Sequence, residues 1–334
     1  MTLIEGDGIG PEIVAATVNV LDALGSPFEW ERYKAGMSAF EEFDDPLPRP
    51  LLDNIRKTKL ALKSPLTTPV GKGFRSATVR LREEFHLYAN VRPAITFIHG
   101  GRFDDIDLVL IRENTEGFYV GVEHYIPIDS DPKAVAEGTG IITRSGCRNI
   151  AKFAFDYAVK HNRKKVTIVH KANILKALTG LFLETAMEVG KDYESKLKIE
   201  ERIVDNTAMQ LVINPSQFDV IVTTNMFGDI LSDEIAGLVG GLGLAPGGNI
   251  GKDVAIFEAV HGSAPDIAGK GVANPTALML AASMMLEHSG LHDLANTLKS
   301  AITKVLQEDK IMTADLGGKA TTMEYTNAII KRIS

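Results

Sequence analysis

Short apolar segments alternate with longer helical segments along most of this chain. The short runs, rich in β-branched residues, have the length of strands and fall at residues 2–5, 107–114, 165–173 and 218–225. Segments with the periodicity of helices fall at residues 11–24, 176–193, 228–240 and 275–307. This alternation predicts an α/β fold with a substantially parallel sheet, and in such folds the ends of the sheet carry the chemistry.

Chain length and glycine content bound the domain organisation. A chain of 334 residues is long for a single core and fits either two lobes or one large α/β domain. The glycine-rich segment 237–251 is interpreted as a helix end that continues into a loop. Residues 120–142 are less periodic and are predicted to form a protruding arm.

Composition and charge exclude several classes of protein. The chain has 45% hydrophobic and 24% charged residues, as ordinary globular proteins do, and its net charge of −7 argues against general nucleic-acid binding. The longest apolar run, residues 276–286, is shorter than the roughly 18 residues that suggest a membrane span. Cys147 is the only cysteine, which excludes an intrachain disulfide and is typical of a reducing compartment. We therefore expect a cytoplasmic protein with no nucleic-acid or membrane partner.

Positive charge is concentrated in one part of this acidic chain, at Lys72, Arg75, Arg80, Arg82, Arg92, Arg102 and Arg112. Thr78 and Arg82 are predicted to share one face of a helix. That helix begins near Ser76, where backbone N–H groups favour anions. With Arg92 and Arg112, these residues predict a clamp for several carboxylates.

The segment GDGIGPE, residues 6–12, lies between a predicted strand and a predicted helix and resembles a dinucleotide-binding turn. Its glycines are spaced G-x-G-x-G, whereas the dinucleotide fingerprint is G-x-G-x-x-G. Pro11 is a common residue at the start of a helix. We interpret the segment as a structural strand-to-helix turn.

Asp229 and Asp233 are four residues apart in the segment NMFGDILSDE. On a helix that begins near Gly228 they project from one face, where their like charges repel. Asp229 as a helix cap with a solvated Asp233 is one interpretation. A divalent cation bound by both carboxylates is the other, with Asp205 as a third oxygen ligand.

Two further candidates follow predicted strands. Tyr119 comes seven residues after Arg112, and Lys171 ends an apolar run. A single tyrosine is more typical of packing, and a single lysine is more typical of the surface. A lysine close to arginines and a metal ion is suited to act as a general base.

Several motifs in a fixed order resemble the isocitrate/isopropylmalate dehydrogenase family of β-decarboxylating dehydrogenases. They are GDGIGPE, LKSPLTTPVGKGFRS, LYANVRP, IRENTEGFY, HKANI, NMFGDILSD, HGSAPDIAGKGVANPTA and DLGG. Together they extend over essentially the whole chain. The resemblance implies NAD-dependent and metal-dependent oxidative decarboxylation of isocitrate to 2-oxoglutarate and CO₂.

The resemblance also assigns roles to individual residues. It implies that Arg82, Arg92 and Arg112 bind the substrate carboxylates. Ser76 matches a serine that binds the γ-carboxylate of isocitrate, and Thr78 stands where isocitrate-specific members usually carry asparagine. This departure keeps homoisocitrate as an alternative substrate, with 3-isopropylmalate as another.

The family's catalytic and metal-binding residues match other positions. Tyr119 matches the acid that protonates the product enolate, and Lys171, from a partner chain, matches the base for the hydroxyl proton. Asp229 and Asp233, with Asp205 of the partner chain, match the ligands of Mg²⁺ or Mn²⁺. The expected assembly is therefore a homodimer, or a higher homo-oligomer, with shared active sites.

The resemblance places the cofactor on residues 261–275 and not on a Rossmann turn. The matching cofactor-binding residues are His261, Gly262, Ala264, Asp266, Ile267 and Asn274. Asp266 stands where members that use NAD carry an aspartate for the ribose hydroxyls. A carboxylate there repels the 2′-phosphate of NADP, so NAD is the predicted cofactor.

The resemblance further implies a two-domain fold. Residues 1–88 and 240–334 are expected to form the larger, cofactor-binding domain, and residues 89–239 the smaller domain with the arm and most of the subunit interface. The non-enzymatic alternative is a regulatory subunit of a hetero-oligomeric isocitrate dehydrogenase. Because all the predicted catalytic and metal-binding residues are present, we favour the enzyme.

Overall fold

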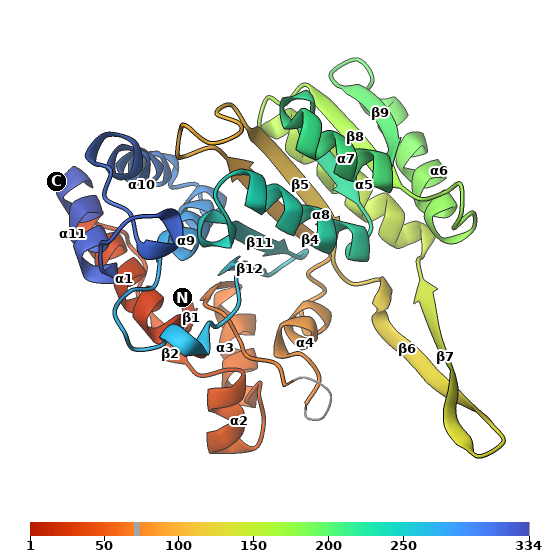
Figure 1. Ribbon diagram of the computed structural model, residues 1–334, viewed down its shortest axis with the longest axis horizontal. Coiled ribbons are helices and arrows are strands. Elements are labelled where there is room, and N and C mark those ends of the chain that lie inside the picture. Colours follow the sequence, from red (N-terminus) through yellow and green to blue (C-terminus); the bar gives the residue numbers. More distant parts are fainter. Residues whose placement is uncertain (70–73, 334) are drawn as a thin grey trace. The chain divides into compact units, whose positions relative to one another are not determined.

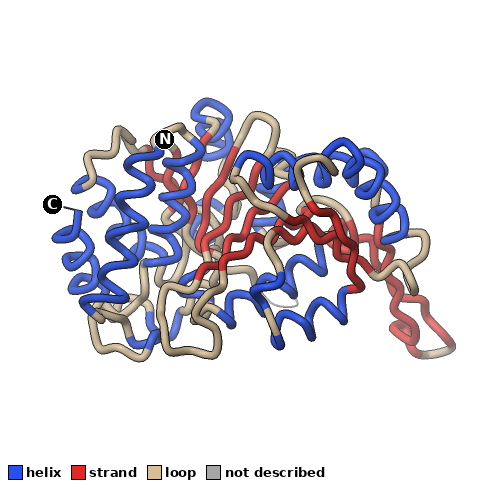
Figure 2. Tube along the Cα trace, turned by 90° about the horizontal axis from the view of Figure 1, so that it is seen from above, coloured by secondary structure: helices blue, strands red, loops and turns tan. Residues whose placement is uncertain are grey.

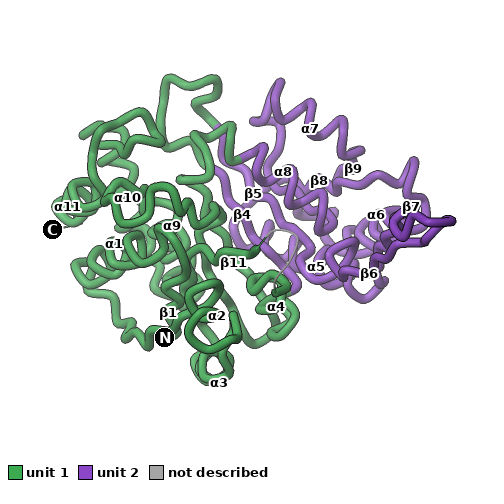
Figure 3. Tube along the Cα trace, turned by 60° about the horizontal axis from the view of Figure 1, so that its bottom comes forward, with its two compact units in different colours: residues 1–87, 95–105, 236–334 green, residues 88–94, 106–235 purple. Residues whose placement is uncertain are grey.

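The computed structural model describes residues 1–69 and 74–333, so Lys72 lies outside the described residues. The chain forms two compact units (Figure 3). Unit 1 comprises residues 1–87, 95–105 and 236–334, and unit 2 comprises residues 88–94 and 106–235. The predicted small domain included residues 95–105, which belong to unit 1.

Unit 1 contains five strands in the spatial order β2-β1-β3-β12-β11. Their bounds are β1 Thr2–Ile4, β2 Glu31–Tyr33, β3 Leu60–Lys63, β11 Pro246–Ile250 and β12 Ala255–Ala259. Strands β1, β2, β3 and β12 pair in parallel, and β11 pairs antiparallel to β12. The strand β11 lies within the glycine-rich segment that was predicted to be a loop.

The helices of unit 1 surround this group of strands (Figure 1). They are α1 Gly10–Ala23, α2 Met37–Phe43, α3 Arg49–Thr58, α4 Ala77–Glu84, α9 Thr276–His288, α10 His292–Lys304 and α11 Thr322–Ile333. The larger hydrophobic core joins α1, α9, α10 and α11 to β3 and β12. A second core lies beneath α3 and α4.

The predicted helical stretch 275–307 is divided into separate helices. Helix α9 ends at His288, and α10 begins at His292 after Gly290, whose φ of 79° favours glycine. A π-helical turn, Val305–Asp309, follows α10. Short 3₁₀ turns in this unit occur at Leu242–Leu244, Pro265–Ile267 and Ala314–Leu316.

In unit 2, the strands that pair side by side follow the order β4-β5-β10-β8-β9. Their bounds are β4 Ala89–Ile95, β5 Asp107–Glu113, β8 Lys165–His170, β9 Lys198–Ile203 and β10 Val220–Thr223. The pairs β5–β10, β10–β8 and β8–β9 are parallel. The predicted α/β class is thereby confirmed.

The helices of unit 2 are α5 Arg144–Lys160, α6 Leu178–Gly190, α7 Val204–Ile213 and α8 Asn225–Leu238, whose last turn belongs to unit 1. Short 3₁₀ turns lie at Lys191–Tyr193 and Pro215–Gln217. Figure 2 shows the helices, in blue, against the red strands. None of the helices in the described part of the chain is long and apolar enough to cross a membrane.

Strands β6 Gly117–Ile128 and β7 Asp131–Ile141 form a separate antiparallel pair within unit 2. This hairpin extends away from the helices and strands of the unit (Figure 1). Most of its side chains are exposed, including Tyr125 and Ile128, which are 55% and 53% exposed. The hairpin occupies the segment predicted to be an arm.

Candidate active site

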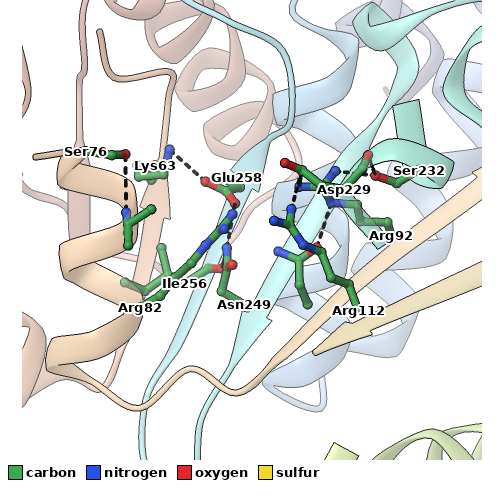
Figure 4. Close-up of polar contacts among 12 residues, drawn as sticks. Lys63, Ser76, Arg82, Arg92, Arg112, Asp229, Ser232, Asn249, Ile256 and Glu258 are labelled. Carbon is green, nitrogen blue, oxygen red and sulfur yellow. Dashed lines mark hydrogen bonds and ion pairs between the residues drawn. The ribbon is translucent and has the colours of Figure 1, made fainter. Parts of the chain in front are cut away.

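A cluster of two arginines and two carboxylates forms in unit 2 from β4, β5 and α8. Figure 4 shows Arg92, Arg112 and Asp229 of this cluster. Arg92 and Arg112 are buried, at 8% and 1% exposure. Arg112 donates a hydrogen bond from Nη1 to Asp229 Oδ1. Arg92 Nη2 lies 3.6 Å from Asp229 Oδ1, and its Nη1 lies 3.6 Å from Asp233 Oδ1. The structure thus brings together four of the predicted site residues.

Neutral side chains fix the orientation of both guanidinium groups. Arg112 donates from Nε and Nη2 to Asn225 Oδ1, at 3.1 and 2.7 Å. Arg92 donates from Nε to Asn90 Oδ1 at 2.7 Å, and its Nη1 bonds to the Ser232 hydroxyl. Because these bonds hold the planar groups in place, both arginines are oriented before a ligand binds. The sequence analysis missed these three supporting residues, since short polar side chains carry no distinctive spacing.

Helix α8 presents the two carboxylates, but it begins at Asn225 and not near Gly228 as predicted. Asp229 therefore lies in the second turn, which contradicts the interpretation of Asp229 as a helix cap. Gly228 packs against Arg112, where an added Cβ would lie 2.5 Å from Arg112 Cγ. The glycine thus allows the helix to lie directly on the buried arginine.

The two α8 carboxylates differ from typical buried ion-pair partners in being accessible. The side chains of Asp229 and Asp233 are 37% and 57% exposed. Burial raises the pKa of Asp233 and so does Asp229, whereas Arg92 and Arg112 oppose this shift. A close pair of accessible carboxylates is a donor set that fits a hard divalent cation.

Within residues 1–69 and 74–333 of one chain, no group of three or more His, Cys, Asp or Glu side chains could hold a metal ion. Asp229 and Asp233 thus supply at most two ligands from one chain. Asp205 lies elsewhere in unit 2, on α7, where it accepts a hydrogen bond from Lys171 Nζ. Its role as a third ligand, from a second chain, stays a prediction.

Tyr119 lies at the start of β6, close to the arginine–carboxylate cluster. Its hydroxyl donates to Asp229 Oδ2, and the Arg112 guanidinium lies over its ring at 5.1 Å from the centroid. The polar tip of Tyr119 is therefore held at the same carboxylate that Arg112 contacts.

Lys171 follows the last residue of β8, and hydrogen bonds of its neighbour fix the chain at this point. His170 Nε2 lies 2.5 Å from Glu201 Oε2, and its Nδ1 accepts the Ala172 N–H at 3.0 Å. The Lys171 ammonium in turn lowers the pKa of Asp205 through their hydrogen bond. Lys171 and Asp205 thus form a pair at the ends of β8 and β9.

In unit 1, helix α4 carries Ser76, Thr78 and Arg82 at its N-terminus and along its length. Ser76 is the N-cap, and its hydroxyl accepts the Val79 N–H at 3.4 Å, so the predicted helix start is confirmed. Arg82 is buried at 7% exposure, and its Nε is buried without a hydrogen-bond partner among the described residues. A buried unpaired donor on a cation fits an anionic ligand.

A buried ion cluster supports Arg82 (Figure 4). Glu258 of β12 is 4% exposed and lies 2.7 Å from Lys63 Nζ and 3.5 Å from Arg82 Nη2. Asn249 Nδ2 donates to the same carboxylate at 2.7 Å. Burial alone would raise the pKa of Glu258, but Lys63, Arg82 and Asn249 outweigh this effect and lower it to about 2. Lys63, Asn249 and Glu258 were not among the predicted site residues. Lys63 and Glu258 are single charged residues in apolar strands, and Asn249 lies in a glycine-rich strand.

Arg75, Arg80 and Arg102, three other basic residues noted in the sequence, have ordinary surface contacts. Arg75 forms hydrogen bonds with Glu83 at 2.8 and 2.5 Å, and Arg80 lies 3.3 Å from Asp45. Arg102 lies over the ring of Phe103, its neighbour. The structure therefore distinguishes the three buried arginines from these exposed cations.

The predicted cofactor residues lie along one loop of unit 1. Gly262, Ala264 and Asp266 are exposed and Ile267 is half-buried. His261 Nδ1 lies 3.0 Å from the Gly262 carbonyl, and burial lowers the His261 pKa, which favours the neutral ring. Its Nε2 is buried with no hydrogen-bond partner among the residues the structure describes.

Asn274 differs from the other predicted cofactor-binding residues in being buried. Its Oδ1 accepts the Thr276 N–H and hydroxyl at 3.0 and 2.6 Å, and its Nδ2 donates to Asp315 at 2.9 Å. These bonds fix the start of α9. Asn274 therefore has a structural role whether or not it contacts a cofactor.

Relatives of this chain include components of NAD-dependent isocitrate dehydrogenases. The catalytic subunit 5 of Arabidopsis thaliana is 48% identical over 330 residues, which are 98% of this chain and 87% of that protein. One regulatory subunit, from Dictyostelium discoideum, is 46% identical over all of this chain and 92% of its own length.

The prediction of a cytoplasmic location is contradicted by these relatives. The Arabidopsis and Dictyostelium proteins are both named as mitochondrial, as is the probable α subunit of Drosophila melanogaster, which is 46% identical over all of this chain and 87% of its own length. A single cysteine and an acidic composition are compatible with any reducing compartment, so they could not identify one.

Two further comparisons cover the chain nearly from end to end. A crystal structure of isocitrate dehydrogenase from Methylococcus capsulatus superposes with a TM-score of 0.96 at 52% identity, over 99% of this chain and 98% of that one. The sequence profile of isocitrate/isopropylmalate dehydrogenases matches residues 1–329. The chain belongs to the isocitrate/isopropylmalate dehydrogenase family.

Proposed function

We propose that the protein catalyses the NAD-dependent oxidative decarboxylation of isocitrate to 2-oxoglutarate and CO₂, with Mg²⁺ or Mn²⁺. The relatives named above, which carry the name isocitrate dehydrogenase, support this proposal. The observation that carries it is the cluster of two oriented, buried arginines beside two accessible carboxylates. Such a cluster binds a carboxylate substrate and a cation next to each other.

Arg92 and Arg112 would bind carboxylates of the substrate. Because Asn90, Asn225 and Ser232 already hold the two guanidinium groups, little side-chain entropy is lost when the substrate binds. In unit 1, we assign Arg82, Ser76 and Thr78 to substrate binding as well, and the unpaired Arg82 Nε supports that assignment.

Asp229 and Asp233 would hold the divalent cation, with Asp205 of a second chain as the third ligand. When bound, the cation supplies Lewis-acid stabilisation of the negative charge that develops on the C2 oxygen. Arg112 and Tyr119 now contact Asp229 and keep its carboxylate in position. The α8 pair thus has the donor chemistry that this cation requires.

Lys171 and Tyr119 would handle the protons. Lys171 Nζ of a second chain would take the proton from the C2 hydroxyl, and NAD, when bound, would supply the hydride acceptor. After loss of CO₂, the Tyr119 hydroxyl donates a proton to C3. Each group acts at one atom of the substrate, so replacement of either is expected to impair a different step.

The exposed loop 261–275 would bind NAD, and Asp266 would accept hydrogen bonds from the adenosine ribose. A carboxylate at this exposed position disfavours the 2′-phosphate of NADP. A higher kcat/KM with NADP than with NAD would overturn this assignment.

We infer that the active form is a homodimer or a higher homo-oligomer that shares its active sites. The exposed apolar residues of the β6–β7 hairpin support an interface there, since large apolar surfaces favour association. Mixing Lys171→Ala chains with Arg82→Ala chains should restore activity, because a hybrid dimer has one intact site. Verified hybrids without recovered activity would contradict shared sites.

A regulatory subunit is the second candidate, since one relative carries that name. The deciding experiment is a steady-state comparison of isocitrate, homoisocitrate, 3-isopropylmalate and malate, each with NAD and with NADP, using the purified protein. We expect the highest kcat/KM with isocitrate and NAD. A kcat/KM for isocitrate tenfold below that for another substrate would assign that other substrate to the protein. No activity with any pair would favour the regulatory role.

A further inference from the structure

The turn GDGIGPE, residues 6–12, contacts the cofactor loop, residues 261–275, at two places. The turn connects β1 to α1 and was interpreted from the sequence only as a structural connection. Both the turn and the loop belong to unit 1. The two contacts lie on either side of residues 264–270, most of which are exposed.

The first contact joins the turn to Ser263. The Ile9 N–H donates to the Ser263 carbonyl oxygen at 2.9 Å. Gly8, with φ of 61°, lies so close that an added Cβ would be 2.0 Å from that oxygen. Thr67 reinforces the contact, since its hydroxyl lies 2.8 Å from the Ser263 hydroxyl. Ser263 itself is buried at 9% exposure.

The second contact is made by Glu12, in the first turn of α1. Its Oε1 accepts the Ala273 N–H at 2.9 Å, and its Oε2 accepts the Gly271 N–H at 3.2 Å. The Thr322 hydroxyl contacts Glu12 Oε1 and the Ala273 carbonyl, and the Thr322 N–H donates to the Gly271 carbonyl at 2.9 Å. One carboxylate and one threonine therefore fix the C-terminal side of the loop.

The loop between the two contacts depends on them for its conformation. Its described backbone hydrogen bonds are internal, from Ile267 to Ala264, from Ala268 to Pro265 and from Lys270 to Ile267. Ala264 adopts a left-handed conformation with φ of 39°, which is unfavourable for alanine without external support. The contacts at Ser263 and at Ala273 provide that support.

We propose that Glu12 is a positioning residue for NAD, which holds the backbone of residues 264–270 in the geometry that binds the cofactor. This inference rests on the proposed binding of NAD to the loop. Hydrogen bonds to a charged carboxylate are about twice as strong as neutral ones, so loss of the charge loosens the loop selectively. Glu12 bonds to Gly271, Ala273 and Thr322, and none of these is a proposed substrate-binding residue, so isocitrate binding should be unaffected.

The test compares Glu12→Gln with two matched substitutions at Thr322. Glu12→Gln should raise both KM and Kd for NAD by about tenfold. Thr322→Val removes the hydroxyl at nearly constant volume and should raise both by about threefold. Thr322→Ser keeps the hydroxyl and should restore the wild-type values. The kcat and the KM for isocitrate should stay within about twofold, which a general loss of structure would not produce.

Asp22→Asn is the control for the charge itself. It removes an exposed carboxylate from the same helix, α1, and should leave every parameter unchanged. Calorimetric measurement of NAD binding to the intact enzyme distinguishes a failure of the proposed function from a failure of the positioning role of Glu12. Wild-type protein that neither binds nor uses NAD would refute the proposed function itself.

Wild-type use of NAD with an unchanged KM for NAD in Glu12→Gln would overturn the positioning role alone. Equal losses for NAD and isocitrate would overturn it as well. Should Glu12→Gln fail to fold, the Thr322→Val and Thr322→Ser pair decides the question, and identical KM values for NAD in the two variants would reject the proposal.

Discussion

The two units each hold buried arginines against carboxylates, but the carboxylates differ in their access to solvent. In unit 1, Arg82 faces Glu258, whose side chain is 5% exposed and also contacts Lys63. In unit 2, Arg112 faces Asp229, whose side chain is 37% exposed. One carboxylate is enclosed by its cations, whereas the other has a face open to a further ligand.

This difference separates a structural role from a chemical one. An enclosed carboxylate that loses its charge leaves two buried cations uncompensated, so its main effect is on stability. An accessible carboxylate loses less solvation energy and can exchange partners, so its main effect is on ligand binding and catalysis. An arginine–carboxylate pair thus supports the fold in unit 1 and forms part of a candidate reaction site in unit 2.

The largest expected effect is on activity, in unit 2. Asp229→Asn should lower kcat/KM for isocitrate on the order of a thousandfold, because it removes a proposed cation ligand and the charged partner of Arg112. Its stability should fall less than its activity, because solvent reaches the Asp229 side chain, which is 37% exposed. Glu234→Gln on the same helix is the matched control, and a loss below tenfold in Asp229→Asn would contradict the proposed role.

The next effect is on stability, in unit 1. Glu258→Gln should lower the free energy of unfolding by about 3 kcal/mol at pH 7, since it leaves Lys63 and Arg82 buried without a counter-charge. Urea unfolding of both proteins measures the difference. A variant as stable as the wild type would show that water or other groups compensate the two cations.

The stability of unit 1 should also depend on pH through Glu258. Its pKa is lowered to about 2 in the folded protein, against about 4.3 in an unfolded chain. A lowered folded pKa gives stability that is present above the unfolded pKa and is lost as pH falls toward 2. The stability difference between wild type and Glu258→Gln should therefore shrink between about pH 4.3 and about pH 2 in urea titrations, and a constant difference would contradict the assignment.

The smallest effect is expected at a neutral support of unit 2. Ser232→Ala removes the hydroxyl that bonds to Arg92 but keeps Asn90 on the opposite side of the guanidinium. The KM for isocitrate should rise about fivefold, the cost of one hydrogen bond, with kcat nearly unchanged. A fall in kcat alone would assign Ser232 to the chemical step.

Periodicity predicted the α/β class and the strands β1, β5, β8 and β10, because strands with apolar residues on both faces carry a strong sequence signal. It missed β11, whose residues PGGNI are typical of a loop. Antiparallel pairing with β12 stabilises this strand, and an added Cβ at Gly248 would press on the Phe257 ring, 3.1 Å away. Such tertiary requirements are not visible in a local pattern.

The candidate site was predicted unevenly for a similar reason. Asp229 and Asp233 were identified by their helical spacing, and the arginines by their charge in an acidic chain. Glu258 could not be identified, since its partner Arg82 is distant in sequence and comes close only in the folded unit. Glu12 could not be identified either, since its partners Gly271, Ala273 and Thr322 are distant in sequence.

The most direct test of the account is the rate of NADH formation from isocitrate by the purified protein in three states. These are protein supplied with Mg²⁺, the same protein after removal of the metal with EDTA, and that protein after Mg²⁺ is added back. We predict activity with Mg²⁺, its loss with EDTA and its recovery when Mg²⁺ is added back. Asp229→Asn should show almost no activity in any of the three states. Undiminished NADH formation after EDTA, or none in any state, would contradict the assignment of the α8 carboxylates to a cation that acts in this reaction.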